Sequence, residues 1–547
     1  MSPMRTLVSA LVLCAPAAAQ TLLYSLSGSP PAQLFGSPVA RAGDVDGDGL
    51  PDLLVGIPGH DGVGTDAGAA QARRGFDGAL LHAWLGEAAL DEFGGAVAAA
   101  GDVDGDGQDD VLVGAARNDT LFSNGGRAYL MSGASGAPLL VLEADGNGDD
   151  EFGVELAGIG DVTGDGVPDL AIGAHHDDVM GGNSGSVRVC SGADGSTWLM
   201  VAGLEPIDDL GHAVDACGDI NLDGVPDFIA GAHDYPDFGE VRVYSGTDGA
   251  VLHHWVGLTT GDFFGHAVSG MPDTDFDGVP DLLVGAAGDD TSAANAGRVL
   301  LFSGASGALL RQWFGDAPTD LIGLWVDYAG DWNLDGVPDV AFSSPGDDTA
   351  GFGSGSGRVH SGGGPELLHW DGPVQGPRFD TSIAGLHDVD GDGRTDLAVA
   401  FVYADTSGPD GGLVQVLAGP SEGPWTDLGG GLAGVAGVPQ LAGQGDLVPG
   451  TQGQLTLDSS AASAACALFL SLIQTGVPFK GGTLSAFPPL ATFYLATDAA
   501  GALVLPWPAW PPGLPAGLEL FFQSAVADPA AVAGVSLSNL LRGTVQA

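Results

Sequence analysis

Aspartate recurs with a fixed spacing in a short loop near the start of the chain. The loop runs from Asp44 to Asp52 with the sequence DVDGDGLPD, so aspartates occupy positions 1, 3, 5 and 9. This spacing turns alternate carboxylates toward one point, while Gly49 at position 6 lets the chain reverse and the carbonyl of Leu50 at position 7 faces inward. Such hard oxygen atoms suit Ca²⁺, which takes about 6–8 oxygen ligands. Without a cation, carboxylates this close together repel one another.

Repetition of the loop argues against an ordinary solvated acidic turn. Seven copies begin at Asp44, Asp102, Asp161, Asp219, Asp273, Asp331 and Asp388, at steps of 54 to 59 residues. Every copy has Asp at positions 1, 5 and 9 and Gly at position 6, and the Thr or Asn at position 3 of three copies still offers an oxygen. We therefore expect up to seven structural Ca²⁺ ions. The expected ligands at positions 1, 3, 5, 7 and 9, with the carbonyl at position 7, are Asp44, Asp46, Asp48, Leu50, Asp52, Asp102, Asp104, Asp106, Gln108, Asp110, Asp161, Thr163, Asp165, Val167, Asp169, Asp219, Asn221, Asp223, Val225, Asp227, Asp273, Asp275, Asp277, Val279, Asp281, Asp331, Asn333, Asp335, Val337, Asp339, Asp388, Asp390, Asp392, Arg394 and Asp396.

An EF-hand is the obvious alternative for such a loop. It requires a bidentate Glu at position 12 and a helix on each side. Position 12 is apolar in every copy, as at Val55 and Val284, and it lies in runs such as Leu53–Gly56 that are typical of buried strands. The loop is therefore predicted to connect two strands.

The second copy shows the complete repeat unit. After an opening Asp-Glu-Phe-Gly, four short apolar segments alternate with turns, and the acidic loop follows the first of them. The expected strands are 96–100, 111–115, 127–131 and 138–142. Small four-stranded sheets repeated along a chain pack radially as a propeller, because each sheet has two faces to cover. A linear β-solenoid is the alternative, although its repeats are usually shorter.

The paired signature of a Phe-Gly opening and an acidic loop before Gly-Ala resembles the FG-GAP repeat family. Phe35-Gly36, Phe152-Gly153 and Phe264-Gly265 carry the opening, and Gly173-Ala174 follows a second strand. The family comprises the propeller repeats of integrin α-chains and of many secreted bacterial proteins, and the resemblance covers roughly residues 21–425. It implies that the matching loops bind Ca²⁺. The last two units depart most, with Ser-Ser-Pro at 343–345 and Ala-Phe-Val at 400–402 in place of Gly-Ala.

The two ends of the repeat region indicate how a ring would close. Residues 22–28 resemble a fourth strand, yet they precede the first unit, while the last unit shows a third strand at 413–417 and then Gly- and Pro-rich sequence. We predict that residues 21–28 form the outermost strand of the last sheet, which protects strand edges. The expected fold class is all-β: a seven-bladed β-propeller over residues 20–425.

Composition changes at both ends of the chain. Residues 1–19 have the pattern of a secretory signal peptide, with Arg5 before an apolar core and small residues before Gln20. Residues 426–547 lack acidic loops and are predicted to form a linker and a small C-terminal β-sandwich, an accessory domain for which sorting or anchoring is left open. No later stretch has the roughly 18 apolar residues of a membrane span. The expected location is secreted, extracellular or at the cell surface.

Net charge and the number of cysteines limit the partners and the disulfide bonds to be expected. The chain has 15 basic and 70 acidic residues, a net charge of −55, so neither nucleic acid nor an anionic membrane is an expected partner. Beyond the signal segment, Cys190, Cys217 and Cys466 are too few for a disulfide framework. Buried free thiols are expected, and a Cys190–Cys217 bond is left open.

Binding residues are expected on the rim opposite the acidic loops. In a four-stranded meander the loops between strands two and three lie at the other end of the sheet from the acidic loops, and loops on a rigid scaffold commonly carry binding. The candidate contacts are His175, His176, His233, Asp234, Tyr235 and Phe238. Ordinary exposed loop residues are the alternative for all six, and a zinc site of the three histidines is a further one.

Signals for catalysis are weak. Gly419–Gly423 fits the Gly-x-Ser-x-Gly string but lacks the strand–turn–helix setting that exposes a nucleophile, and the many acids hide any glycosidase pair. We expect a non-catalytic extracellular binding or adhesion protein for a protein or glycan, not an enzyme. A secreted enzyme acting on polysaccharide or lipid is the alternative, and a purely structural surface-layer role is a third.

Overall fold

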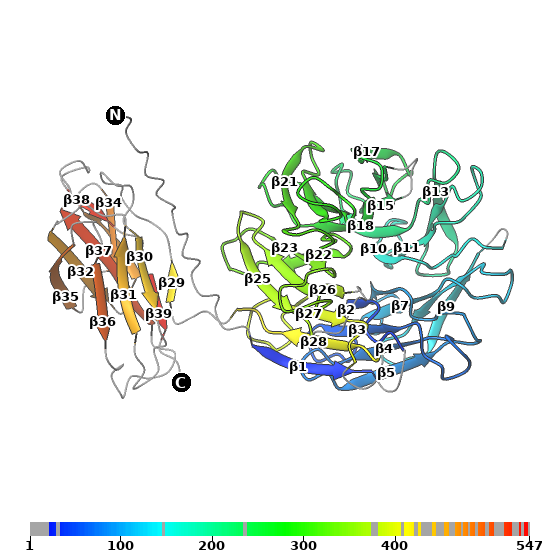
Figure 1. Ribbon diagram of the computed structural model, residues 1–547, viewed down its shortest axis with the longest axis horizontal. Coiled ribbons are helices and arrows are strands. Elements are labelled where there is room, and N and C mark those ends of the chain that lie inside the picture. The colour runs from blue at the N-terminus through cyan, green and yellow to red at the C-terminus, as the bar shows by residue number, and fades with distance from the viewer. Residues whose placement is uncertain are drawn as a thin grey trace, which may run out of the picture. The chain divides into compact units, whose positions relative to one another are not determined.

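A computed structural model describes residues 21–28, 33–144, 148–233, 238–373, 381–405 and 410–420, and the strands between residues 425 and 544 (Figure 1). The predicted signal peptide lies outside these residues. The chain divides into two compact units, Met1–Pro420 and Ser421–Ala547. All regular secondary structure in the described part of the chain is β-strand.

The first unit is a seven-bladed β-propeller, as the sequence predicted (Figure 1). Each blade is a four-stranded antiparallel sheet, and in six of them the strand order follows the chain. Blades one to three are formed by β2 (Val39–Gly43), β3 (Asp52–Ile57), β4 (Ala69–Arg73), β5 (Leu80–Leu85); β6 (Val97–Gly101), β7 (Asp110–Ala115), β8 (Arg127–Met131), β9 (Pro138–Glu143); and β10 (Leu156–Gly160), β11 (Asp169–Ala174), β12 (Ser186–Cys190), β13 (Thr197–Ala202). Blades four to six are formed by β14 (Ala213–Gly218), β15 (Asp227–Ala232), β16 (Glu240–Tyr244), β17 (Val251–Val256); β18 (Phe264–Met271), β19 (Asp281–Ala286), β20 (Arg298–Phe302), β21 (Leu309–Phe314); and β22 (Val326–Gly330), β23 (Asp339–Ser344), β24 (Ser356–His360), β25 (Glu366–Asp371). Blade seven contains β26 (Thr381–His387), β27 (Asp396–Phe401), β28 (Leu413–Leu417) and β1 (Leu22–Ser27).

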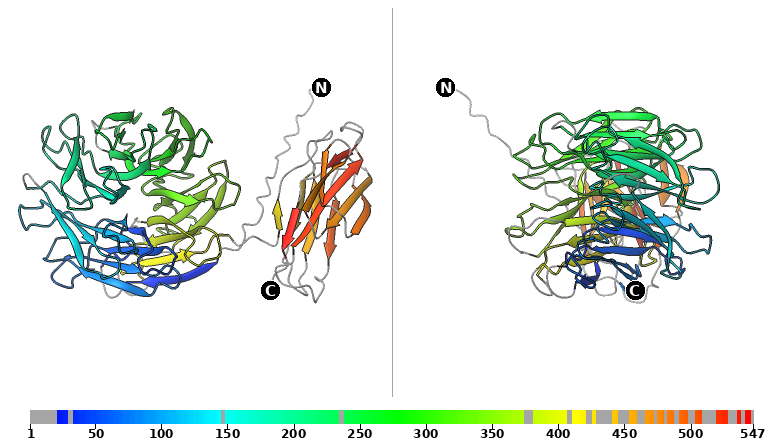
Figure 2. Two further views of the ribbon diagram at one scale, coloured as in Figure 1. Left: turned by 180° about the vertical axis from the view of Figure 1, so that it is seen from behind. Right: turned by 90° about the vertical axis from the view of Figure 1, so that its right-hand side faces the viewer.

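The N-terminal strand completes the last blade. β1 pairs antiparallel with β28, with Leu26 opposite Val414. The first strands of neighbouring blades contact one another all the way round, including β26 of blade seven with β2 of blade one. Figure 2 shows the resulting wheel from behind and from the side. In a linear stack the first and last sheets would not touch. Here β2 of blade one contacts β26 of blade seven, so the solenoid alternative is wrong.

Burial along the strands follows from the position of each strand in its blade. The second strand of every blade is buried at all six residues, as at Asp52–Ile57, because both of its faces lie between neighbouring blades. This explains why these segments are apolar runs and do not alternate. The fourth strands at the outer edge consist mainly of exposed and half-buried residues, with one buried residue each in β5 (Trp84) and β9 (Leu142).

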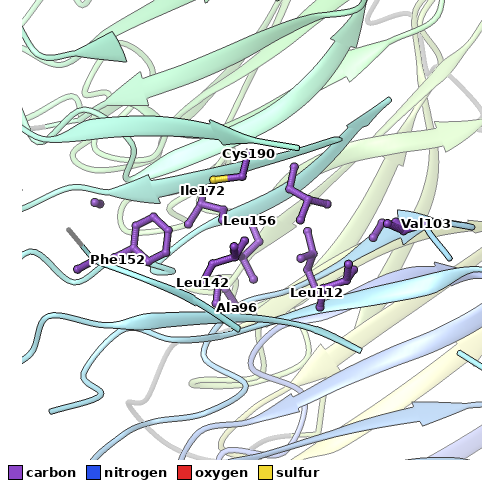
Figure 3. Packing of buried hydrophobic residues seen from close by; sticks show 14 residues of the cluster. Ala96, Val103, Leu112, Leu142, Phe152, Leu156, Ile172 and Cys190 are labelled. Carbon is purple, nitrogen blue, oxygen red and sulfur yellow. The ribbon is translucent and has the colours of Figure 1, made fainter. Parts of the chain in front are cut away.

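The hydrophobic core of the wheel consists of seven clusters, each between two neighbouring blades. Between blades two and three, Leu112 and Leu142 face Phe152, Ile172 and Cys190 (Figure 3). Outer-strand tryptophans add polar ties between blades: Trp84 Nε1 donates to the carbonyl of Gly136 of the next blade at 2.8 Å, and Trp255 Nε1 to Gly307 at 3.0 Å. Removing one blade would therefore expose two clusters.

The second unit is also all-β. A six-stranded sheet has the order β29-β39-β37-β32-β35, with β38 paired to β37, and a three-stranded sheet has the order β30-β31-β36. A hairpin of β33 and β34 accompanies them. The strands are β29 (Trp425–Asp427), β30 (Gln440–Gln444), β31 (Gly453–Asp458), β32 (Ala465–Ser471), β33 (Gln474–Phe479), β34 (Gly482–Ala486), β35 (Ala491–Ala496), β36 (Leu503–Trp507), β37 (Glu519–Ala527), β38 (Val535–Leu537) and β39 (Leu541–Thr544).

The structure bears on three expectations from the sequence: the boundary between the two units, the state of the cysteines and the absence of a membrane span. The division falls at Pro420, slightly before the expected residue 425, because β29 pairs with β39 of the second unit. Cys190, Cys217 and Cys466 are buried and form no disulfide bond, so the Cys190–Cys217 bond that the sequence left open is absent. Among the described residues, no helix has the length and apolar character needed to cross a bilayer.

Candidate metal loops and the opposite loop face

The acidic loops connect the first and second strands of each blade, as expected, and not two helices. In the first loop Asp44 accepts hydrogen bonds from three backbone N–H groups: Gly47 at 2.8 Å and Asp48 at 3.0 Å on Oδ1, and Gly49 at 2.9 Å on Oδ2. The bond from Gly at position 6 to Asp at position 1 recurs in all seven loops, as does the bond from the N–H at position 7 to Asp at position 5. The backbone therefore orients these carboxylates before any ion binds.

Position 9 has a second role that the loop sequence does not reveal. Its aspartate is fully buried in every blade, with no exposed surface. In blade one, Asp52 accepts from Val45 N at 2.9 Å and from Asp46 N at 3.3 Å within the loop, and from Gly75 N at 2.9 Å in the turn between strands three and four. The bonds from position 2 and from the distant turn recur in all seven blades. This residue joins two turns of its blade.

Burial raises the pKa of several loop carboxyls. Desolvation raises the pKa of Asp52 to about 6 and those of Asp339 and Asp396 to about 7, although the N–H groups bound to them oppose the shift. The pKa of Asp46 is raised by desolvation and then by the charge of Asp48. The ionised loops are thus costly on their own, and a bound cation would offset that cost.

The donor atoms in the loops fit Ca²⁺. Carboxylate oxygens of three aspartates lie within 4.8 Å of one another in the first, second and fifth loops: Asp44, Asp46 and Asp48; Asp102, Asp104 and Asp110; and Asp273, Asp275 and Asp281. All are hard oxygen donors, which Ca²⁺ prefers. The loop of blade seven differs, because Arg394 at position 7 places its Nε 3.9 Å from Asp392 Oδ2. A guanidinium there already balances part of the charge.

On the opposite rim, the structure brings three of the expected contact residues into one histidine cluster. His175 and His176 follow β11, and their rings lie 4.0 Å apart. Glu151, from the loop before β10, contacts both: its Oε2 is 2.9 Å from His175 Nε2 and its Oε1 is 3.8 Å from His176 Nδ1. The hydrogen bond to His175 lowers the pKa of Glu151, which favours the carboxylate. His233 joins the cluster from blade four.

Two further histidines complete this cluster, and sequence reasoning missed them. His212 lies 3.9 Å from the ring of His233 and 5.0 Å from that of His266, centroid to centroid. Burial pushes the pKa of His212 well below its usual value, so its ring is neutral. Both missed residues directly follow the Phe-Gly position of their repeats, in Leu-Gly-His and Phe-Gly-His. Aligning the repeats on that position would have found them.

The remaining expected contacts are Phe238, Asp234 and Tyr235. Phe238 is 37% exposed, at the end of its loop before β16. Asp234 and Tyr235 lie outside the described residues. The zinc alternative of His175, His176 and His233 did not include Glu151, which bridges the first two.

A cavity of about 580 Å³ lies between the first strands of all seven blades. His212 and His266 line it, together with acidic side chains that include Glu155 and Asp215. Desolvation raises the pKa of Glu155 to about 8 and that of Asp215 to about 7. The histidine cluster therefore borders the central channel of the wheel.

The seven blades close into a ring, and each carries an acidic loop between its first two strands. The protein is therefore a seven-bladed β-propeller with a repeated acidic loop. The FG-GAP repeat family matches residues 38–71, 93–131 and 152–190, which cover most of blades one to three. The first three blades therefore carry FG-GAP repeats.

Curated relatives are integrin α chains. The chain is 33% identical to chicken (Gallus gallus) integrin alpha-6 over 154 residues, which is 26% of this chain and 14% of the relative. It is 33% identical to chicken integrin alpha-V over 217 residues, or 36% of this chain and 20% of the relative, and 33% identical to human (Homo sapiens) integrin alpha-IIb over 167 residues, or 28% and 16%. The matches thus span 14 to 20% of the length of these relatives.

A solved structure titled "Crystal Structure of Mitotic Checkpoint Complex" contains a chain of weak overall similarity. The TM-score is 0.43 at 11% identity, over 75% of this chain and 98% of that one. This likeness is too weak to inform fold or function.

Proposed function

We propose that this chain is a secreted, non-catalytic binding or adhesion protein. Ca²⁺ held by the acidic loops stiffens one rim of the propeller, and the opposite loop face binds an extracellular protein or glycan. When bound, the ion supplies positive charge that neutralises the clustered carboxylates. The rigid ring then holds seven sets of loops in fixed relative positions.

The observation that carries this proposal is the shared geometry of the seven loops. In each one, backbone N–H groups hold the carboxylates at positions 1 and 5 in place. Up to seven Ca²⁺ ions are expected, most tightly in the first, second and fifth loops, where position 3 is also Asp and position 7 is uncharged. The last loop also has Asp390 at position 3, but the charge of Arg394 at position 7 makes it the weakest candidate.

Exposed apolar side chains support a binding role for the opposite face. Leu204 and Ile207 precede blade four and are 61% and 62% exposed, and Leu258 precedes blade five and is 76% exposed. Met180, between β11 and β12, is 56% exposed. Exposed apolar side chains beside polar loops are typical of interaction surfaces. The acidic rim also exposes apolar side chains, at Leu222, Phe276 and Leu334, so the two faces need to be compared by experiment. The sequence relatives are integrin α chains, and none of the relatives named above is named as an enzyme, which also favours a binding role.

The calcium part of the proposal is tested by thermal unfolding. A ligand that binds the native state raises stability by RT ln(1 + [L]/Kd), about 2.7 kcal/mol at 100 times Kd for one site. Melting temperature should rise clearly between excess chelator and millimolar Ca²⁺. Superimposable melting curves in the two conditions would refute calcium binding.

The binding part is tested by screening the Ca²⁺-loaded protein against glycan arrays and extracellular protein panels. Leu258→Ser should weaken the binding of a partner found in this screen, because Leu258 lies on the proposed face. Phe276→Ser is the matched control: Phe276 is 70% exposed, but it lies in the acidic loop of blade five. Equal effects of both changes would count against a dedicated loop face, and turnover of a polysaccharide or lipid would favour the enzyme alternative.

A further inference from the structure

We infer that Glu151, His175 and His176 form a binding site for a transition-metal ion of the zinc class, separate from the acidic loops. The site lies on the loop face, at the join of blades two and three. It does not depend on the proposed calcium role, because none of its ligands belongs to an acidic loop.

Distances between the donor atoms fit one ion. One donor atom from each of the three side chains lies within 4.8 Å of the others. Glu151 Oε2 is 2.9 Å from His175 Nε2, and Glu151 Oε1 is 3.8 Å from His176 Nδ1. Zinc binds imidazole nitrogen and carboxylate oxygen at roughly 2.0–2.2 Å, so neighbouring donors around a tetrahedral ion lie roughly 3.3–3.5 Å apart. Small side-chain rotations bring one Glu151 oxygen, His175 Nε2 and His176 Nδ1 to that spacing.

A supporting contact orients His175 for this role. Its Nδ1 lies 3.2 Å from His212 Nδ1, and the two rings are nearly parallel, at 3° and 5.4 Å between centroids. When His175 Nε2 binds the ion, His175 Nδ1–H donates to His212 Nδ1. Metal-binding histidines almost always donate their second ring N–H in this way, which sets the tautomer. His212 is thus a positioning residue.

The donor set selects against Ca²⁺ and for zinc-like ions. Two imidazoles and one carboxylate suit Zn²⁺, Co²⁺ or Ni²⁺, whereas Ca²⁺ takes oxygen donors. Side-chain exposure is 12% for His175, 15% for Glu151 and 30% for His176, so the site opens to solvent. Three protein ligands leave a fourth position for water or for a donor atom of a bound molecule.

A second histidine–carboxylate group offers a contrast. Asp347, His369 and Asp371 also place donor atoms within 4.8 Å of one another. There, however, Arg358 Nη2 lies 2.6 Å from Asp347 Oδ2, and both side chains are buried. A guanidinium already neutralises that site. Near Glu151, Arg117 Nε is 3.9 Å from Oε1, but Arg117 is half exposed and its Nη1 pairs with Glu92 at 2.7 Å.

The test is a Co²⁺ titration of the tag-free, full-length protein in saturating Ca²⁺, followed by visible absorption and by Zn²⁺ competition. One equivalent of Co²⁺ should produce the d–d bands of a four-coordinate site, and one equivalent of Zn²⁺ should remove them. His176→Ala should weaken binding by more than the roughly 10–100-fold that loss of a supporting residue costs. His176 is partly exposed, so this variant should fold normally, which its melting curve checks.

Matched variants separate this site from other histidines. His60→Ala is the control on the same face, since His60 lies in the loop between β3 and β4 and accepts a hydrogen bond from Gly62 N at 3.0 Å. It should leave Co²⁺ binding unchanged, whereas His212→Gln should weaken it by roughly 10–100-fold and keep the spectrum. Absence of saturable binding, binding that survives His176→Ala, or loss on His369→Ala in its place would overturn the proposal.

Discussion

The two rims of the propeller follow opposite rules although the second strand of every blade leads from one rim to the other. On the acidic rim, one hydrogen-bond pattern recurs in every blade, and the aspartate at position 9 is buried in all seven. On the loop face, the connections between second and third strands differ from blade to blade in sequence and length. The acidic rim therefore repeats the same stabilising contacts in every blade, and the loop face is where the chain is free to vary.

This contrast explains where sequence variation is tolerated. A change at position 9 leaves at least two backbone donors, from two different turns, without their acceptor. A change in an exposed loop on the other face mainly alters what a partner would contact. If this is right, changes on the acidic rim should lower stability, and changes on the loop face should mainly affect the binding of a partner.

The largest effect is expected for Asp110→Ala on the acidic rim of blade two. Asp110 accepts from Val103 N at 2.8 Å, Asp104 N at 3.2 Å and Gly133 N at 2.9 Å. Each buried donor left without a partner costs about 1–3 kcal/mol, so the free energy of unfolding should fall by about 3 kcal/mol or more. Urea unfolding should show this loss in chelator, and a larger loss in Ca²⁺, because Asp110 is also an expected ligand of the ion.

Asp110→Asn is the control for that experiment, because one side-chain oxygen remains as an acceptor. It should lose less stability than Asp110→Ala. A variant with Ala that is as stable as the wild type in chelator would show that position 9 matters only for the ion.

An intermediate effect is expected for Asp48→Ala at position 5 of the first loop. Asp48 is exposed, and its carboxylate accepts from Leu50 N at 2.9 Å. Its loss should remove the calcium-dependent stabilisation of blade one, about 2–3 kcal/mol at 100 times Kd, and cost little in chelator. Thermal melts with and without Ca²⁺ measure the difference; a loss of equal size in both conditions would contradict the ligand role.

Stability without Ca²⁺ should fall as pH rises from about 4 to about 7. Burial raises the pKa of Asp339 and Asp396 to about 7 and that of Asp52 to about 6. A carboxyl whose pKa is higher in the folded state stabilises the fold below its unfolded value of about 3.9, and this contribution is lost as pH rises through the folded pKa.

Urea unfolding in chelator between pH 4 and pH 8 measures this dependence. Ca²⁺ should reduce it, because the ion favours the ionised loops. Asp339→Asn should also flatten it, since the amide does not titrate. A pH profile that is the same in wild type and in this variant would argue against the buried carboxyl as its source.

The smallest effect on stability is expected for Ile207→Ser on the loop face. Ile207 is 62% exposed, and such surface changes usually stay within about 0.5 kcal/mol. Melting temperature should barely change, whereas binding to an identified partner should weaken. A loss of stability comparable to that of Asp110→Ala would remove the distinction between the rims.

Much of this fold was predictable from local pattern. Aspartates at fixed spacing and apolar runs of strand length recur within each unit of about 58 residues, and a Phe-Gly opening recurs in four of them. Together they predict seven four-stranded blades. The pairing of β1 with β28 followed from one displaced strand pattern before the first unit. Each of these signals involves residues close in sequence, whose geometry the backbone itself sets.

The sequence by itself determined the loops, the blades and the order in which they follow one another. Tertiary structure alone decided that Asp52 also accepts a hydrogen bond from Gly75 in a different turn, and that His212 lies between His175 and His233. These contacts join residues of different turns or different blades. They depend on how far each sheet is rotated from the next, and no spacing along the chain encodes that rotation.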